Sequence, residues 1–264
     1  MPRLFQSEWN GIDLEAIAKL PGTLQGGSPG ARFYAEYYRR LASAGGAAGT
    51  GWEREKLANA EALRGWLDQL ALELGRPATQ LRVISVGAGL GVVEQPLVLE
   101  GFQITLHEVQ DESLEQARRR MAATGHELPT VVGPLSAIAE RFDVAYLGTC
   151  EYAITSSRAH EEFFQSVRAT LVPGGGIIAM DVAPSWRMVT RDLLDRVGVH
   201  RGILWGEVRS AGRRAAALNR SGFRVERIEY HGPGFKSPLA VSKSPLRISP
   251  RGTSTVTIIG RVAS

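Results

Sequence analysis

The chain has 264 residues and one cysteine, Cys150, so it can form no internal disulfide, and one α/β domain with an appended segment accounts for its length. Its 44% hydrophobic and 22% charged residues are typical of a globular protein whose core needs no disulfide or metal support. A net charge of +4, carried mostly by scattered arginines, is more typical of solvated helix faces than of a nucleic-acid-binding stripe.

Residues 1–80 are predicted to form a helical extension. From residue 53 to residue 74, leucine and alanine recur at three- and four-residue steps, which indicates one apolar face of a long helix. The segment RFYAEYYRRLA, residues 32–42, is a second helix candidate. We expect its aromatic residues to pack against the rest of the molecule or to line a substrate pocket, and the candidates for that pocket are Tyr34, Tyr37 and Tyr38.

From residue 81 onward, apolar strand candidates alternate with helix candidates, which predicts βαβ units and a parallel sheet covered on both faces. The strand candidates are 81–86, 102–108, 128–132, 142–148 and 175–182. Two further strand candidates, 222–230 and 253–262, have no helical segment between them and should pair antiparallel. Residues 231–252 are rich in proline, glycine and serine and are interpreted as a long loop.

The first strand candidate runs into the stretch VISVGAGLG, with glycines at positions 87, 89 and 91. Such a stretch allows a strand to turn sharply into a helix and leaves backbone N–H groups open to a ligand, although a turn without any ligand has the same signature. Glu108 ends the next strand candidate, 21 residues past Gly87, where a carboxylate can accept hydrogen bonds from both hydroxyls of a ribose. Together these features favour an adenosine-type cofactor.

The segment 81–264 resembles the class I S-adenosylmethionine-dependent methyltransferases. The resemblance rests on five motifs in order: VISVGAGLG, Glu108, the strand FDVAYL at 142–147, the turn LVPGGGIIAMDV at 171–182, and LNRSGFRVERIEY at 218–230. It implies a doubly wound Rossmann-like sheet of seven strands, of which the last is antiparallel. It also implies S-adenosylmethionine as cofactor and S-adenosylhomocysteine as product.

The resemblance and the position of each residue at a strand end together give the candidate cofactor-binding residues, which are Ser85, Gly87, Ala88, Gly89, Gly91, Glu108, Val109, Pro134, Leu135, Gly148 and Thr149. The sequence departs from the family pattern at two places. Ser85 stands where the family usually has an acid that organises the turn, and the stretch VVGPLSA, residues 131–137, lacks an acid near the expected adenine.

Candidate catalytic residues are Glu151 and Tyr152, which follow the fourth strand directly, and His231, which follows the sixth. His160, at a predicted helix start, is expected to lie at the surface. Trp186 follows the fifth strand and is a candidate substrate contact, and the basic residues of the loop 231–252 could cover the substrate. The histidines and the cysteine show no metal-ligand spacing, so no metal is expected.

These features favour methylation of the oxygen, nitrogen or carbon atom of a small-molecule acceptor by in-line displacement. Transfer of a 3-amino-3-carboxypropyl group from the same cofactor, methylation of RNA, and cofactor binding without catalysis stay open as alternatives. No leader segment or membrane span is recognisable, so we expect a cytoplasmic protein without a membrane partner. The sequence leaves open whether the chain forms a homodimer.

Overall fold

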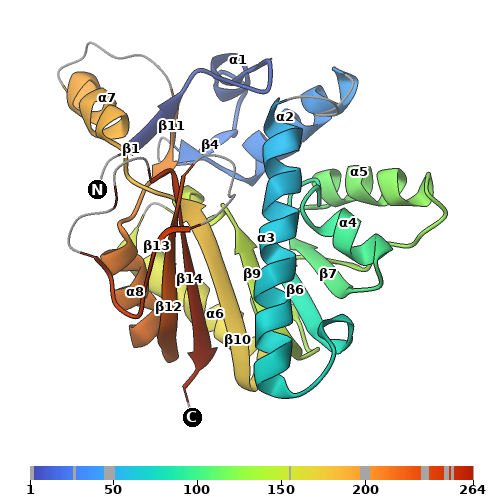
Figure 1. Ribbon diagram of the computed structural model, residues 1–264. Helices are drawn as coiled ribbons and strands as arrows, with labels where there is room; N and C mark the ends of the chain where they lie inside the picture. The colour runs from blue at the N-terminus through green and yellow to red at the C-terminus, as the bar shows by residue number, and fades with distance from the viewer. Residues whose placement is uncertain are drawn as a thin grey trace.

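The computed structural model describes residues 3–25, 28–44, 51–154, 156–196, 203–232, 238–246, 250 and 253–263. Its centre is a sheet of eight strands in the order β13-β12-β14-β10-β9-β6-β7-β8 (Figure 1). Five of these strands are mutually parallel: β6 (Arg82–Val86), β7 (Gln103–Glu108), β8 (Thr130–Val132), β9 (Phe142–Gly148) and β10 (Leu171–Val182).

The C-terminal strands complete the sheet. β14 (Thr255–Val262) lies between β10 and β12 (Phe223–His231) and is antiparallel to both, which confirms the prediction of a doubly wound sheet that ends in an antiparallel strand. An eighth strand, β13 (Pro238–Ser242), pairs antiparallel with β12. Its segment was interpreted as loop because a five-residue edge strand between prolines and serines has little apolar alternation.

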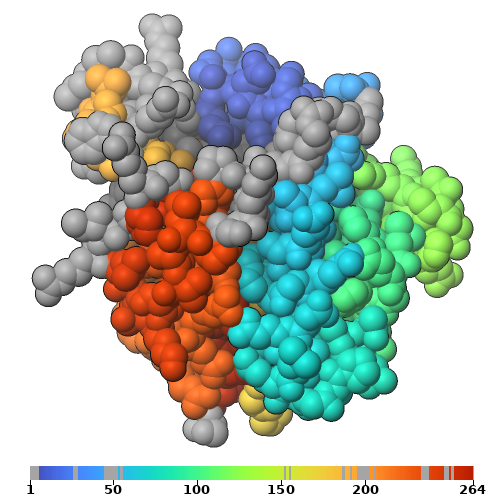
Figure 2. Space-filling model, viewed as in Figure 1, coloured from blue at the N-terminus to red at the C-terminus, as the bar shows by residue number. Residues whose placement is uncertain are grey.

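Helices cover both faces of the sheet because alternate strand residues point to opposite sides. Val83 of β6 packs in one core with α3 (Gly51–Leu74), α4 (Glu94–Leu99) and α5 (Asp111–Ala122). Ile84 packs in the opposite core with α6 (Ser157–Ala169) and α8 (Ala211–Arg220). In Figure 2, α3 covers the sheet between the C-terminal strands and α4 with α5.

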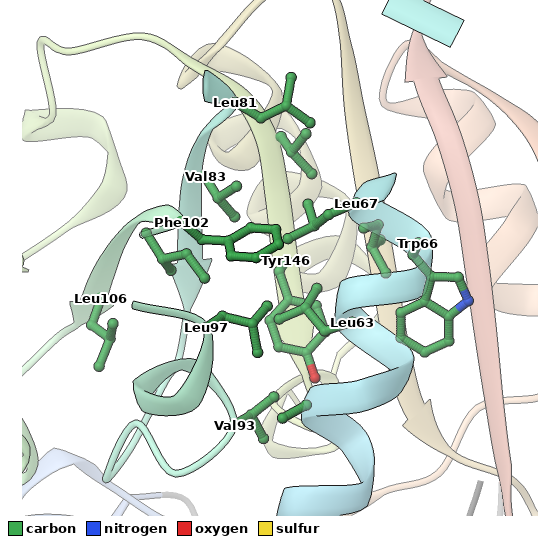
Figure 3. Close-up of a cluster of buried hydrophobic side chains, with 14 of the residues drawn as sticks. Leu63, Trp66, Leu67, Leu81, Val83, Val93, Leu97, Phe102, Leu106 and Tyr146 are labelled. Atoms are coloured by element: carbon green, nitrogen blue, oxygen red, sulfur yellow. The ribbon is translucent and has the colours of Figure 1, made fainter. Parts of the chain in front are cut away.

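The packing of α3 onto the sheet follows from its leucine spacing. Leu63 and Leu67 are fully buried, and Figure 3 shows their side chains directed toward Tyr146 of β9 and Phe102. Each such leucine contributes about 2 kcal/mol of stability through burial. In Figure 1, the N-terminal end of α3 lies at the upper end of the sheet.

A cap lies over that end of the sheet. It contains α1 (Leu14–Ala18), α2 (Ala31–Ser43) and five short strands: β1 (Arg3–Gln6), β2 (Glu8–Trp9), β3 (Ile12–Asp13), β4 (Leu24–Gln25) and β5 (Ser28–Pro29). β1 pairs with β11 (Ile203–Glu207), and α7 (Trp186–Arg196) precedes β11. The N-terminal region, expected to be helical, is therefore mixed, because strands of two to four residues carry no readable period.

The remaining helical segments are single 3₁₀ turns: η1 (Ala78–Gln80), η2 (Leu135–Ala137) and η3 (Glu151–Ala153). Within the described residues, none of the helices is long and apolar enough to span a membrane.

Candidate functional site

A cavity of about 610 Å³ lies at the carboxyl ends of β6, β7 and β9, beneath the cap. Cavities at this edge of an open parallel sheet are the usual ligand sites of doubly wound folds. Nine of the predicted cofactor residues line it: Gly87, Ala88, Gly89, Glu108, Val109, Pro134, Leu135, Gly148 and Thr149. The other two, Ser85 and Gly91, are not among its lining residues.

The glycine turn has the shape that the sequence predicted, with φ of +67° at Gly87, +58° at Gly89 and +61° at Gly91. A side chain at Gly91 would place its Cβ 2.4 Å from Cδ2 of Leu106, so this glycine permits close packing of the turn on β7. The sequence predicted that the backbone N–H groups of this turn would be open to a ligand, but two of them are bonded within the protein. Those of Gly87 and Ala88 donate to the carbonyl of His107 (3.0 and 3.2 Å), so the turn supplies the cavity with shape more than with donors.

Glu108 ends β7 at the cavity wall. One oxygen of its carboxylate, Oε1, accepts a hydrogen bond from the Gly89 N–H at 2.7 Å, which fixes the side chain against the glycine turn. Burial raises the pKa of this carboxyl group, and hydrogen bonds from the N–H groups of Gly89 and Val109 oppose that rise. The second oxygen can still accept from a ligand hydroxyl.

Glu94, at the start of α4, is a candidate site residue that the sequence analysis missed. It is 2% exposed and lines the cavity, and its Oε1 accepts a hydrogen bond from Ser85 Oγ at 2.6 Å. The strand therefore lacks the acid that the family pattern has at position 85. The carboxylate of Glu94, nine residues later, lies next to the side chain of residue 85 instead. A glutamate just past the glycines was the only available signal. Burial raises its pKa to about 6, although the Ser85 hydrogen bond and the charge of Lys56 oppose the rise.

Replacing Glu94 by glutamine is expected to raise the free energy of unfolding of the unliganded protein by about 2 kcal/mol at neutral pH. The folded-state pKa lies above its ordinary value of 4.5, so ionisation destabilises the wild-type fold as pH rises from 4.5 to about 6. Urea denaturation should show no difference between the two proteins below pH 4.5 and the full difference above pH 6. A variant that is less stable than wild type at the higher pH would contradict this prediction.

Lys56 brings a positive charge from α3 to the same cavity. Its Nζ donates to Oγ1 of Thr149 at 2.9 Å, across 93 residues of sequence. Thr149 has a φ of +63°, which is unusual for a β-branched residue and turns the chain sharply after β9. A single lysine in a long leucine-rich helix carries no sequence signal for this position.

The structure places Glu151 outside the cavity lining, which corrects its expected catalytic position. Its carboxylate is 1% exposed and binds Arg214, whose Nε lies 2.9 Å from Oε2. His160 is buried too, although it was expected at the surface, and its Nε2 lies 2.9 Å from the same oxygen. Burial alone would raise the pKa of Glu151, but Arg214 and His160 outweigh it and hold the pKa low. Glu151 therefore joins η3 to α6 and α8.

His231 is also remote from the lining residues of the cavity. It is buried at the end of β12, where its Nε2 lies 3.0 Å from the carboxylate of Glu229 and its ring meets the indole of Trp66 edge-on. The Trp66 Nε1 donates to Glu229 at 3.0 Å as well. This arrangement ties α3 to β12 and contradicts a position for His231 beside a substrate.

The cap contributes aromatic walls to the cavity. Tyr34 and Tyr38 of α2, two of the three tyrosines expected at a substrate pocket, line it, and the hydroxyl of Tyr38 lies 2.8 Å from the place where a Gly89 Cβ would stand. Tyr37 does not line it: its buried ring stacks on Trp9 with 4.7 Å between centroids. Trp9 itself is a lining residue that the sequence analysis missed.

Several predicted residues lie partly or wholly outside the described part of the structure. The side chains of Tyr152 and Trp186 belong to this group, as do Lys236 and Arg247, two of the basic residues of the segment 231–252 that could cover the substrate. Among the residues that are described, no cluster of three histidine, cysteine, aspartate or glutamate side chains is arranged to hold a metal ion.

Comparison with known proteins shows which solved structures have a similar fold. No family model matches the chain, and no curated protein matches it significantly. Magnesium protoporphyrin IX methyltransferase from Synechocystis, solved with bound SAH, superposes with a TM-score of 0.61 at 12% identity, over 88% of this chain and 96% of that one.

Two further solved structures are S-adenosylmethionine-dependent methyltransferases. The one from Methanosarcina mazei gives a TM-score of 0.54 at 13% identity over 69% of this chain and 92% of its own. The one from Clostridium acetobutylicum gives 0.53 at 12% identity over 88% and 98%. The chain therefore has the Rossmann-like fold of the class I S-adenosylmethionine-dependent methyltransferases.

Proposed function

We propose that the protein is an S-adenosylmethionine-dependent methyltransferase that acts on a small-molecule acceptor. The observation that carries this proposal is the cavity at the carboxyl ends of β6, β7 and β9, where the glycine turn and Glu108 meet under an aromatic cap within a methyltransferase fold. When bound, S-adenosylmethionine supplies a methyl group already activated by its sulfonium.

The residues of the cavity fit such a cofactor. The carboxylate of Glu108 accepts from ribose hydroxyls, and Pro134 and Leu135 offer apolar surface for an adenine ring. Gly148 and Thr149 line the part of the cavity next to Lys56 and Glu94, where the amino-acid end belongs. Along the sheet edge, the adenine contacts thus follow β8, the ribose contact ends β7, and the amino-acid contacts lie at the end of β9.

The acceptor would lie between the cofactor and the cap. Trp9, Tyr34 and Tyr38 present aromatic surface there, which favours an apolar or planar small molecule over a nucleic-acid strand. Burial raises the pKa of Tyr34 far above neutrality, so its hydroxyl stays protonated and can donate a hydrogen bond. Displacement at a methyl carbon mainly requires alignment of three atoms, which a cavity between the sheet edge and the cap can supply.

Of the residues expected to act as a catalytic base, only one stays a candidate. The buried pairing of Glu151 and of His231 takes both out of the proposed reaction. Tyr152 stays a candidate, because it stands in η3 between Cys150 and Ala153, which both line the cavity.

Calorimetric titration of the purified protein tests the cofactor directly. We expect S-adenosylmethionine and S-adenosylhomocysteine to bind with micromolar affinity and NADH not to bind. Binding of NADH alone, or of none of the three, would contradict the proposal.

Acceptor screening by product mass then identifies the transferred group. A gain of one methyl group supports the proposed reaction, whereas a gain of an aminocarboxypropyl group identifies the alternative transferase. RNA that binds with a steep loss of affinity as salt rises would instead favour RNA as the acceptor.

A further inference from the structure

Glu94 lies in the cavity wall with only one of its two carboxylate oxygens hydrogen-bonded to a described residue. Its Oε1 is held by Ser85, but its Oε2 is buried without a hydrogen-bond partner among the described residues. A carboxylate that is 2% exposed and has a hydrogen-bond donor for only one oxygen lowers the stability of the fold, unless a positively charged group binds the other oxygen.

A second polar atom without a hydrogen-bond partner stands nearby. The buried hydroxyl of Tyr146 has none among the described residues, and it lies 3.0 Å from where a Cβ on the lining residue Gly148 would stand. Figure 3 shows this hydroxyl directed toward Val93, the residue before Glu94. The charge of Glu94 acts on the ionisation of Tyr146, as expected for neighbouring groups. Glu94 Oε2 in the cavity wall and the Tyr146 hydroxyl behind Gly148 are thus two buried oxygen atoms without a hydrogen-bond partner among the described residues.

We propose that Glu94 binds the ammonium group at the amino-acid end of the cofactor. This assignment rests on the proposed function and deepens it. An ammonium group has three N–H donors and one positive charge. It can therefore donate to the second carboxylate oxygen of Glu94, beside the Tyr146 phenol, and neutralise the charge of that carboxylate. A water molecule would supply donors but no charge.

The position of Lys56 agrees with this assignment. Its Nζ is held at Thr149, one residue past Gly148, and its charge is close enough to Glu94 to act on the ionisation of that carboxyl group. An amino-acid group carries a carboxylate beside its ammonium, so Lys56 and Glu94 offer opposite charges to its two ends. The acid thus stands on α4 instead of on β6, with Ser85 holding it in place.

The test uses three nucleosides with the same adenosine thioether that differ in the group on the sulfur atom. S-adenosylhomocysteine has both the ammonium and the carboxylate, its decarboxylated analogue has the ammonium alone, and 5′-methylthioadenosine has neither. Calorimetry on Glu94→Gln should show affinities about ten- to a hundredfold lower for the first two and an unchanged affinity for 5′-methylthioadenosine. Glu100→Gln, at the C-cap of the same helix but exposed and paired with Arg64, is the matched control and should bind all three as wild type does.

Ser85→Ala provides a second variant that leaves the carboxylate in place. It removes the hydrogen bond that orients Glu94, so we expect a smaller loss confined to the same two ligands. An equal loss for all three nucleosides in Glu94→Gln would overturn the assignment, since the residue would then act on the shape of the cavity. Unchanged affinities would overturn it too. If wild type bound none of the three nucleosides, the proposed function would fall, and this assignment with it.

Discussion

Replacing Glu151 by glutamine is expected to lower the free energy of unfolding by about 3–5 kcal/mol. The amide removes the negative charge but leaves the guanidinium of Arg214, which is 1% exposed and also donates to the carbonyls of Ala179 and Val256 (both 2.8 Å). A buried cation without its counter-ion costs far more than a lost surface pair. The effect should therefore appear in stability first and in any methyl transfer only as a consequence.

Urea denaturation of Glu151→Gln beside Glu161→Gln checks this prediction. Glu161 pairs with Arg220 at the protein surface, so its variant should leave the unfolding midpoint almost unchanged. The pKa of Glu151 is held low in the folded state, so its contribution is present above the ordinary carboxyl range and disappears as pH falls through the folded pKa. An unchanged midpoint together with lost transferase activity would contradict our interpretation and return Glu151 to a catalytic role.

The sequence predicted the parts of the fold that carry a repeating pattern. The strands β6, β7, β9 and β10 and the helix α3 were found because apolar residues cluster or recur with a regular period over at least five residues. The strand β8 has only three residues and was found inside a five-residue candidate. The cap strands are two to four residues long, and β13 stands among prolines, so no period could reveal them. They form because pairing partners far along the chain, such as β11 for β1, complete their hydrogen bonds.

The candidate site was predictable where backbone conformation or strand position determines it. Gly87 needs a positive φ, and Glu108 ends a strand, and both properties are readable from one sequence. The burial of Glu151 could not be predicted from the sequence. Its partner Arg214 is 63 residues away and reaches Glu151 only because α8 packs on the sheet. The displacement of the acid from position 85 to Glu94 was hidden for the same reason, since only the fold brings Ser85 and Glu94 together.

Replacing Glu108 by alanine is expected to lower the affinity for S-adenosylhomocysteine by about a hundredfold. Hydrogen bonds to a charged carboxylate contribute about 1.5–3 kcal/mol each, and a ribose offers two hydroxyls to this one side chain. Calorimetry gives the change directly. Glu112→Gln is the matched control, because Glu112 lines the same cavity but is exposed and lies in the first turn of α5 instead of ending a strand.

The ribose contact can be separated from the effect of Glu108 on the glycine turn, since its Oε1 also holds the Gly89 N–H. If the carboxylate binds the ribose, 5′-methylthioadenosine should lose about tenfold in affinity for wild type when its 2′-hydroxyl is removed. Glu108→Ala should bind the two nucleosides equally, because the partner of that hydroxyl is gone. A variant that still distinguishes them as wild type does would show that the ribose lies elsewhere, and that Glu108 acts only by holding the turn that shapes the cavity.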